Sequence, residues 1–320
     1  MASAKKKIEV RALASSLDER DRAILYALLE HKVLTTHHLR ALFFRSLRRC
    51  QHRLRELKDL EIISSFPLAL EFGKGRLPEH YFLTSLGRAV LAFLEGVPRE
   101  DLPWVPDETY RDNKNLRHRM GVNAFFCSLA EASLQHEGHC LERWRPERKV
   151  RTRAGEIQPD GFGRYLHPCG ACEFYLEYDR ATEGITALAG KLRGYVRMAA
   201  GWGERVQFPN LLILVPTAHR EPEVARAWTD GARGSANGST VSVFVTNEEL
   251  LLVLGVLGPV WLPAGRERDR LCLTELPATD GGPYELGRCL GRYWTEAGAW
   301  PRISPFSWAA RFPAGEPRRS

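Results

Sequence analysis

Five consecutive apolar residues, Leu211-Leu212-Ile213-Leu214-Val215, set the strongest limit on the fold of this chain. A strand with one face in water alternates polar and apolar residues, whereas a strand covered on both faces does not. The run therefore predicts a strand that is buried on both faces. It ends at Pro216, and it is far too short to cross a bilayer, which needs about 20 apolar residues.

The segments around this strand predict a mixed domain of class α+β or α/β between residues 107 and 262. Their order is αβββαβ followed by αβα. The predicted helices are 115–134, 182–200, 221–229 and 248–254, and the predicted strands are 140–151, 157–166, 173–178, 211–215 and 240–245. Beyond it, residues 263–320 have a weaker pattern and are expected to be a C-terminal extension that packs on the domain in places.

Residues 17–96 predict a separate, mostly helical domain. Asp18 and Thr84 are of the residue types that begin helices well. Three helices, a hairpin with a basic tip and a closing helix follow the order of a winged helix-turn-helix. The predicted helices are 18–31, 37–44, 46–60 and 86–94, and the predicted strands are 62–66 and 80–83. Residues 1–16 are expected to be a mobile basic tail, and the proline-rich residues 97–106 a linker.

The helix at 46–60 combines an apolar face with a basic one. Leu47, Cys50, Leu54 and Leu57 recur at spacings of three and four, so they share one side. The opposite side fits the major groove of double-stranded DNA, where arginine reaches guanine edges or phosphates. The predicted DNA-binding residues are Arg45, Arg48, Arg49, His52, Arg53 and Arg55, with Lys74 and Arg76 at the hairpin tip. The net charge of +7 suits a polyanionic partner. A solvated basic helix without a partner, or a dimerisation module, would give the same pattern.

Carboxylates lie on two successive predicted strands of the second domain. If these strands form a hairpin, Asp160 lies beside Glu177, and Glu177 shares a strand face with Asp179. Converging carboxylates suit Mg²⁺, which prefers oxygen ligands and supports phosphodiester hydrolysis. We expect Asp160 and Glu177 to hold the metal, with Asp179 in support and Lys191 positioning water or stabilising charge.

Further residues add to this candidate site. Tyr195 lies one helical turn after Lys191 and on the same face, and Glu147 and Glu183 are further candidate acids. A purely structural interpretation remains open: Asp179 and Glu183 would then cap a helix, and Lys191 would pair with Glu183 or be solvated.

Seven cysteines, an odd number, and a basic start without a following apolar segment predict reduced thiols in a cytoplasmic protein, with no membrane partner. The pair Cys169 and Cys172 supplies two thiols where a structural zinc site needs four ligands, so we expect a hairpin turn there rather than zinc.

The sequence resembles the replication-relaxation family over residues 18–277. The segments that carry the resemblance are Pro159-Asp160-Gly161, Leu176–Glu183, Lys191–Tyr195, His118–Asn123, Trp144–Glu147 and Gly258–Leu262. This resemblance implies a winged helix joined to a nuclease-like domain of the PD-(D/E)xK type, found on plasmids and other mobile elements. It implies metal ligands at Asp160 and Glu177, but a lysine two residues after Glu177, where this chain has Asp179. Lys191 would then be a lysine that has moved to the helix.

Two functions remain open at this stage. One is a Mg²⁺-dependent, nickase-like DNA endonuclease that works in plasmid replication or relaxation. The other is a DNA-binding replication-accessory or transcriptional regulatory protein whose second domain keeps the fold without catalysis. Its partners would be a second copy of the chain or other replication and mobilisation proteins.

Overall fold

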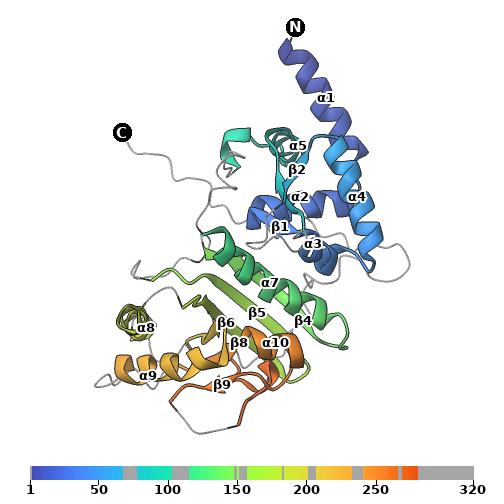
Figure 1. The fold of residues 1–320 in the computed structure, drawn as a ribbon. Helices are drawn as coiled ribbons and strands as arrows, with labels where there is room; N and C mark the ends of the chain where they lie inside the picture. The colour runs from blue at the N-terminus through green and yellow to red at the C-terminus, as the bar shows by residue number, and fades with distance from the viewer. Residues whose placement is uncertain are drawn as a thin grey trace, which may run out of the picture. The chain divides into compact units, whose positions relative to one another are not determined.

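The computed structural model describes residues 2–67, 78–102, 115–147, 150, 157–181, 184–200, 207–232, 241–265 and 269–279 (Figure 1). They form two compact units, the first within residues 2–102 and the second within residues 115–279. Within these ranges, no helix has both the length and the apolar character needed to cross a membrane.

The first unit combines helices with a three-stranded antiparallel sheet of order β1-β3-β2. Its elements are α1 (Ala2–Ser16), α2 (Glu19–His31), β1 (Val33–Thr35), α3 (Thr36–Phe43), α4 (Leu47–Asp59), β2 (Ile63–Phe66), β3 (His80–Leu83) and α5 (Ser85–Glu95), with a 3₁₀ turn at Arg99–Asp101. The predicted starts of the helices α2 and α5 are confirmed. The side chain of Asp18 accepts a hydrogen bond from the backbone N–H of Asp21 (2.8 Å), and that of Thr84 accepts one from the backbone N–H of Gly87 (3.0 Å).

Two features of the first unit differ from the prediction. The N-terminal segment is the helix α1 rather than a mobile tail, because Val10, Ala14 and Leu17 bury a stripe at helical spacing and α1 packs on α5. The short strand β1 was not predicted, since three residues are too few to show a period. It pairs with β3 and so completes the sheet. Most of the predicted hairpin tip, including Lys74 and Arg76, lies outside the described residues.

The second unit is built on a mixed six-stranded sheet of order β4-β5-β6-β7-β8-β9. Strands β6, β7 and β8 are parallel, and the other neighbours pair antiparallel. The elements are α7 (Leu116–Ser133), β4 (Cys140–Pro146), β5 (Gly161–His167), β6 (Gly170–Tyr178), α8 (Ile185–Ala200), β7 (Asn210–Val215), α9 (Glu221–Ala232), β8 (Val243–Asn247), α10 (Glu248–Leu254) and β9 (Leu262–Pro263), with 3₁₀ turns at Ala218–Arg220 and Leu273–Glu275. The predicted order is confirmed, and the two-residue β9 is an addition.

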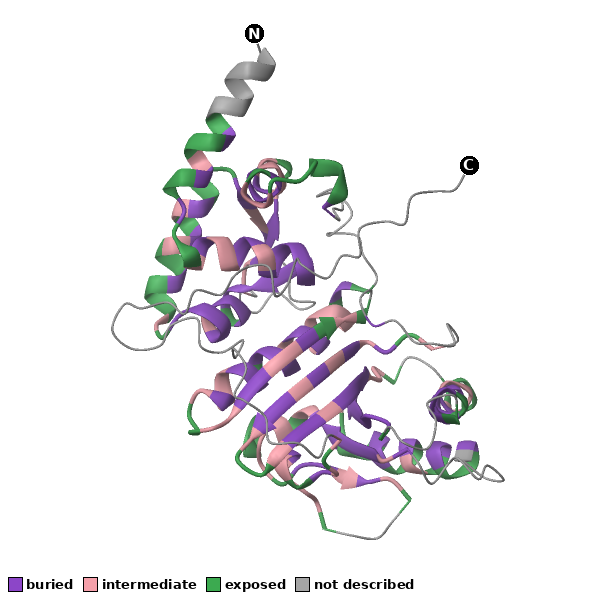
Figure 2. Ribbon diagram, turned by 180° about the vertical axis from the view of Figure 1, so that it is seen from behind, coloured by how far each residue is buried: buried purple, intermediate pink, exposed green. Residues whose placement is uncertain are grey.

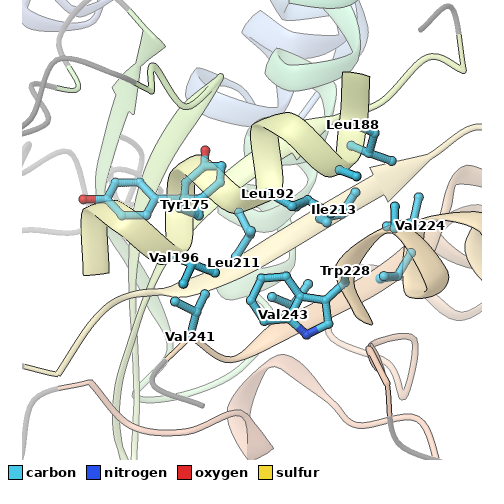
Figure 3. Packing of buried hydrophobic residues seen from close by; sticks show 14 of the residues in the cluster. Tyr175, Leu188, Leu192, Val196, Leu211, Ile213, Val224, Trp228, Val241 and Val243 are labelled. Atoms are coloured by element: carbon cyan, nitrogen blue, oxygen red, sulfur yellow. The ribbon is translucent and has the colours of Figure 1, made fainter. Parts of the chain in front are cut away.

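Helices cover both faces of this sheet. On one face α8 and α9 pack on β7 and β8 through side chains such as Leu192, Ile213 and Trp228 (Figure 3). On the other face Phe126 of α7 stacks on Trp144 of β4 and Phe174 of β6. All six residues of β7 are buried, as the apolar run predicted, while β5 alternates between buried and less buried residues along much of its length (Figure 2).

Candidate active site

Asp160 lies in a bend immediately before β5. The strands β5 and β6 form the predicted hairpin, and Gly161 pairs with Leu176, so Asp160 comes next to Glu177. The Oδ2 atom of Asp160 accepts a hydrogen bond from the backbone N–H of Tyr178 (2.8 Å) and lies 3.0 Å from Nε2 of His118. The side chain of Asp160 keeps 11% of its surface exposed, so it lies at the edge of the solvent.

Glu177, near the end of β6, is buried, with 4% of its surface exposed. Both of its carboxylate oxygens have partners on α8. The ammonium of Lys191 forms an ion pair with Oε2, and the hydroxyl of Tyr195 donates a hydrogen bond to Oε1. Lys191 and Tyr195 lie one helical turn apart, as predicted, and the side chain of Lys191 is 34% exposed, so it connects the buried carboxylate to the surface.

The surroundings of Asp160 and Glu177 shift the pKa values of these two carboxyl groups in opposite directions. Burial and the negative charge of Asp160 raise the pKa of Glu177 to about 8, although Lys191 and Tyr195 act against this. Burial also favours the neutral form of Asp160, but the contact with His118 and the charge of Lys191 outweigh it and lower the pKa of Asp160. Neighbouring groups with divergent pKa values are typical of functional sites.

Asp179 belongs to a different network. Its Oδ2 accepts a hydrogen bond from Nε of Arg220 (2.8 Å), and Arg220 also pairs with Glu223 (2.6 Å). Its other oxygen accepts a hydrogen bond from the backbone N–H of Ala181 (2.9 Å). The strand β6 ends at Tyr178, so the alternation that would have joined Asp179 to Glu177 stops before it.

The sequence also predicted Glu147 and Glu183 as supporting acids, and the structure describes only the first of them. Glu147 follows β4, is exposed, and its backbone N–H donates to the carbonyl of Asp160 (3.1 Å), so the chain brings it beside Asp160. Glu183 lies outside the described residues.

The residue types at Asp160 and Glu177 fit a magnesium ion. In the described parts of the chain, no group of three or more His, Cys, Asp or Glu side chains is placed to hold a metal. Mg²⁺ does not require such a group, because it is commonly held by one or two carboxylates together with waters and substrate phosphates. A metal ion at Glu177 would share the oxygens of this carboxylate with Lys191 and Tyr195, or replace one of these contacts.

Of the predicted cysteine pair, Cys169 lies in the turn between β5 and β6, and Cys172 lies on β6. Cys169 is exposed and Cys172 is buried, where the side-chain amide of Asn210 lies 3.4 Å from its sulfur. Burial raises the pKa of Cys172 to about 12, which disfavours the thiolate that a zinc ligand must supply.

His118, on the first turn of α7, was not predicted as a site residue. It lies 42 positions before Asp160 in the sequence, and no spacing rule connects a helix start to a strand start at that distance. Only the arrangement of α7 beside the β5–β6 hairpin brings the two together.

The helix α4 presents the predicted basic face. Its apolar side buries Cys50, Leu54 and Leu57, whereas Leu47 is 37% exposed because it is the first residue of the helix. The exposed basic residues, on α4 or just before it, are Arg45, Arg48, Arg49, His52, Arg55 and Lys58.

Arg53 differs from these neighbours. It is half-buried and binds the fully buried Asp21 of α2 through two of its nitrogens, with an Nε–Oδ1 distance of 2.7 Å. A third nitrogen pairs with Glu56 at 2.6 Å. Its observed partners are therefore carboxylates: Asp21 connects α4 to α2, and Glu56 lies on α4 itself.

The family model named replication-relaxation matches residues 25–211, more than half of the chain. No curated protein matches. Two solved structures of the restriction endonuclease FokI, one of them bound to DNA, are similar at 14% and 15% identity, with TM-scores of 0.28 and 0.29. These matches cover 73% and 74% of this chain but 43% of each FokI chain. Similarity this weak adds nothing to what the geometry shows.

The arrangement is thus a helical unit with a basic helix face, and a mixed-sheet unit in which two carboxylates at neighbouring strand ends meet a lysine of α8. The chain belongs to the replication-relaxation family.

Proposed function

We propose that this chain is a DNA-binding protein with a metal-dependent, nickase-like endonuclease site of the PD-(D/E)xK type, acting on plasmid or other mobile-element DNA. One observation carries the proposal. Asp160 before β5, Glu177 on β6 and Lys191 on α8 come from three separate elements and meet at one place. Surface charges scattered at random would not bring two acids of opposite pKa shift to one lysine.

Each residue has a distinct task in this site. Asp160, which its lowered pKa keeps ionised, and Glu177 would hold Mg²⁺, and Glu177 would release its proton when the ion binds, because its pKa is raised to about 8. When bound, the ion would polarise the phosphodiester and promote ionisation of a water. The ammonium of Lys191 lies against Glu177, and its side chain is 34% exposed, so it would also stabilise negative charge on a phosphate bound there. Tyr195 fixes the other oxygen of Glu177 and so sets the orientation of that carboxylate.

The first unit would deliver this site to DNA as a winged helix. The helices α2, α3 and α4 precede the strands β2 and β3, and α4 presents a row of exposed cations. In a winged helix this third helix enters the major groove. Phosphate contacts from Arg48, Arg49 and Arg55 would supply affinity that falls with salt.

Incubating supercoiled plasmid with the protein and Mg²⁺ tests the catalytic proposal. The expected result is nicked circles with wild type and none with Asp160→Asn or Glu177→Gln. Glu249→Gln, which changes an exposed acid of α10, is the matched control and should nick like wild type. Absence of nicking by wild type, or equal nicking by the two site variants, would contradict the proposal.

A second function is favoured by one specific contact set. Both oxygens of Glu177 are bound by side chains of α8, which is also how a buried acid is satisfied in a purely structural role. The protein would then be a DNA-binding replication-accessory or transcriptional regulatory protein. It would shift DNA in gels without cutting it at any Mg²⁺ or Mn²⁺ concentration.

A further inference from the structure

We propose that His118 is a positioning residue that fixes the carboxylate of Asp160 for metal binding; this inference rests on the proposed nuclease function. His118 comes from α7, which contributes no other residue to the site as the sequence predicts it. It would act through Asp160 rather than on the DNA itself.

The contact is direct. Nε2 of His118 lies 3.0 Å from Oδ2 of Asp160, and an ionised carboxylate only accepts hydrogen bonds, so Nε2 is the donor. The backbone N–H of Tyr178 donates to the same oxygen at 2.8 Å. Two donors from different elements on one oxygen fix the rotation of the carboxylate about its Cβ–Cγ bond.

The imidazole is itself supported. The ring of Tyr178 lies beside it, with centroids 5.5 Å apart, and the hydroxyl of Tyr178 donates to Glu248 at 2.6 Å. The tyrosine ring lies so close to α7 that a Cβ on Gly121 would come within 2.2 Å of its Cε1 atom. Glycine at position 121 is therefore required for Tyr178 to approach His118.

This arrangement matches what metal sites need beyond their ligands. A ligating carboxylate that is free to rotate loses entropy on binding, whereas one already held by hydrogen bonds does not. Loss of such an outer partner typically costs 10–100-fold in metal affinity or activity. His118 is 31% exposed and Asp160 only 11%, so the contact lies at the protein surface and leaves part of the carboxylate exposed.

The test measures Mn²⁺ binding by calorimetry and plasmid nicking against Mn²⁺ concentration, with the full chain and no other metal. His118→Ala is expected to weaken Mn²⁺ binding by about 10–100-fold and to raise the Mn²⁺ concentration for half-maximal nicking equally. His118→Gln should recover part of the loss, because its amide N–H₂ reaches close to the position of Nε2. The same two substitutions at His219, an exposed residue of the second unit, are the controls and should bind like wild type.

Each outcome decides the inference. If His118→Ala binds Mn²⁺ like His219→Ala while wild type nicks DNA, the role of His118 is overturned and the proposed function stands. If wild type binds Mn²⁺ without nicking, the proposed function fails and the affinities still decide the role of His118. If wild type does not bind Mn²⁺, both are overturned. Should His118→Ala unfold, the comparison of His118→Gln with His219→Gln replaces it.

Discussion

The basic face of α4 and the carboxylate site of the second unit use charge in opposite ways. On α4 the cations stand in water on one element, and most of them can act independently. In the carboxylate site the acids are buried or nearly buried, and each is held by groups from other elements. The difference implies that substitutions on α4 should have small, additive effects, whereas those in the carboxylate site should be large and coupled.

Arg53 is the exception on α4, because it pairs with a buried acid. The largest predicted effect is on the stability of the first unit, through this pair. Asp21→Asn removes the charge from a fully buried partner of Arg53 and should lower the free energy of unfolding by about 3–5 kcal/mol. Urea unfolding measures it. Glu56→Gln removes the exposed partner of the same arginine and should change stability little. Equal effects from the two variants would show that burial is not what distinguishes the pairs.

Lys191 tests the coupling of the carboxylate site. Lys191→Met should reduce the nicking rate by about 100–1000-fold, because it removes the cation that we propose to stabilise charge on the phosphate, while DNA affinity stays close to wild type. Arg193→Met changes an exposed cation on the same helix and is the matched control. A wild-type rate for Lys191→Met would exclude the lysine from catalysis.

The two units should respond to pH with opposite sign, measured in metal-free buffer. In the first unit burial lowers the pKa of His38 to about 3, so the unfolded chain binds a proton there that the native one rejects, and stability rises with pH from about 3 to 6.5. In the second unit the pKa of Glu177 is raised to about 8, so the native state holds the extra proton and stability falls from about pH 4.5 to 8.

Between pH 5 and 6.5 each group should therefore contribute about 2 kcal/mol, in opposite directions. Hydrogen exchange of the N–H groups of β3 and β7 reports the two units separately. His38→Asn, which keeps an acceptor for the backbone N–H of Thr35, should remove the rise of stability with pH in the first unit. Glu177→Gln should remove the fall of stability with pH in the second unit. Slopes of the same sign in both units would refute the assignment of these buried groups.

The smallest effect is expected on α4. The double reversal Arg48→Glu with Arg49→Glu should weaken DNA binding by about tenfold and reduce its salt dependence, as measured by gel shift across ionic strength. Arg226→Glu, an exposed arginine of α9, should leave both unchanged. Unaltered affinity or no salt dependence in the wild type would contradict groove binding by α4.

The sequence predicted those features that depend on local periodicity. Apolar spacing located α4 and its exposed arginines, and the unbroken apolar run located β7. The hairpin prediction also brought Asp160 next to Glu177, because a short connection between two strand patterns implies a hairpin. Asp160 itself lies in the bend before β5 and not on the strand predicted for residues 157–166.

Other features depend on long-range packing and left no local signal. Arg53 and Arg49 look equivalent in the sequence, and only the position of Asp21 on α2 separates them. His118 joins Asp160 through the placement of α7, and Asp179 is drawn to Arg220, which follows β7. Strands of two or three residues, such as β1 and β9, are too short to show alternation.

The two contacts of α8 with Glu177 limit how the length of this helix can change in evolution. Lys191 and Tyr195 are one turn apart and hold separate oxygens of one carboxylate, so a single inserted residue ahead of both would rotate them about 100° away together. Length variation is therefore tolerable before α8 begins but not between its start and Tyr195. Relatives of this chain that preserve the site should show gaps only outside that interval.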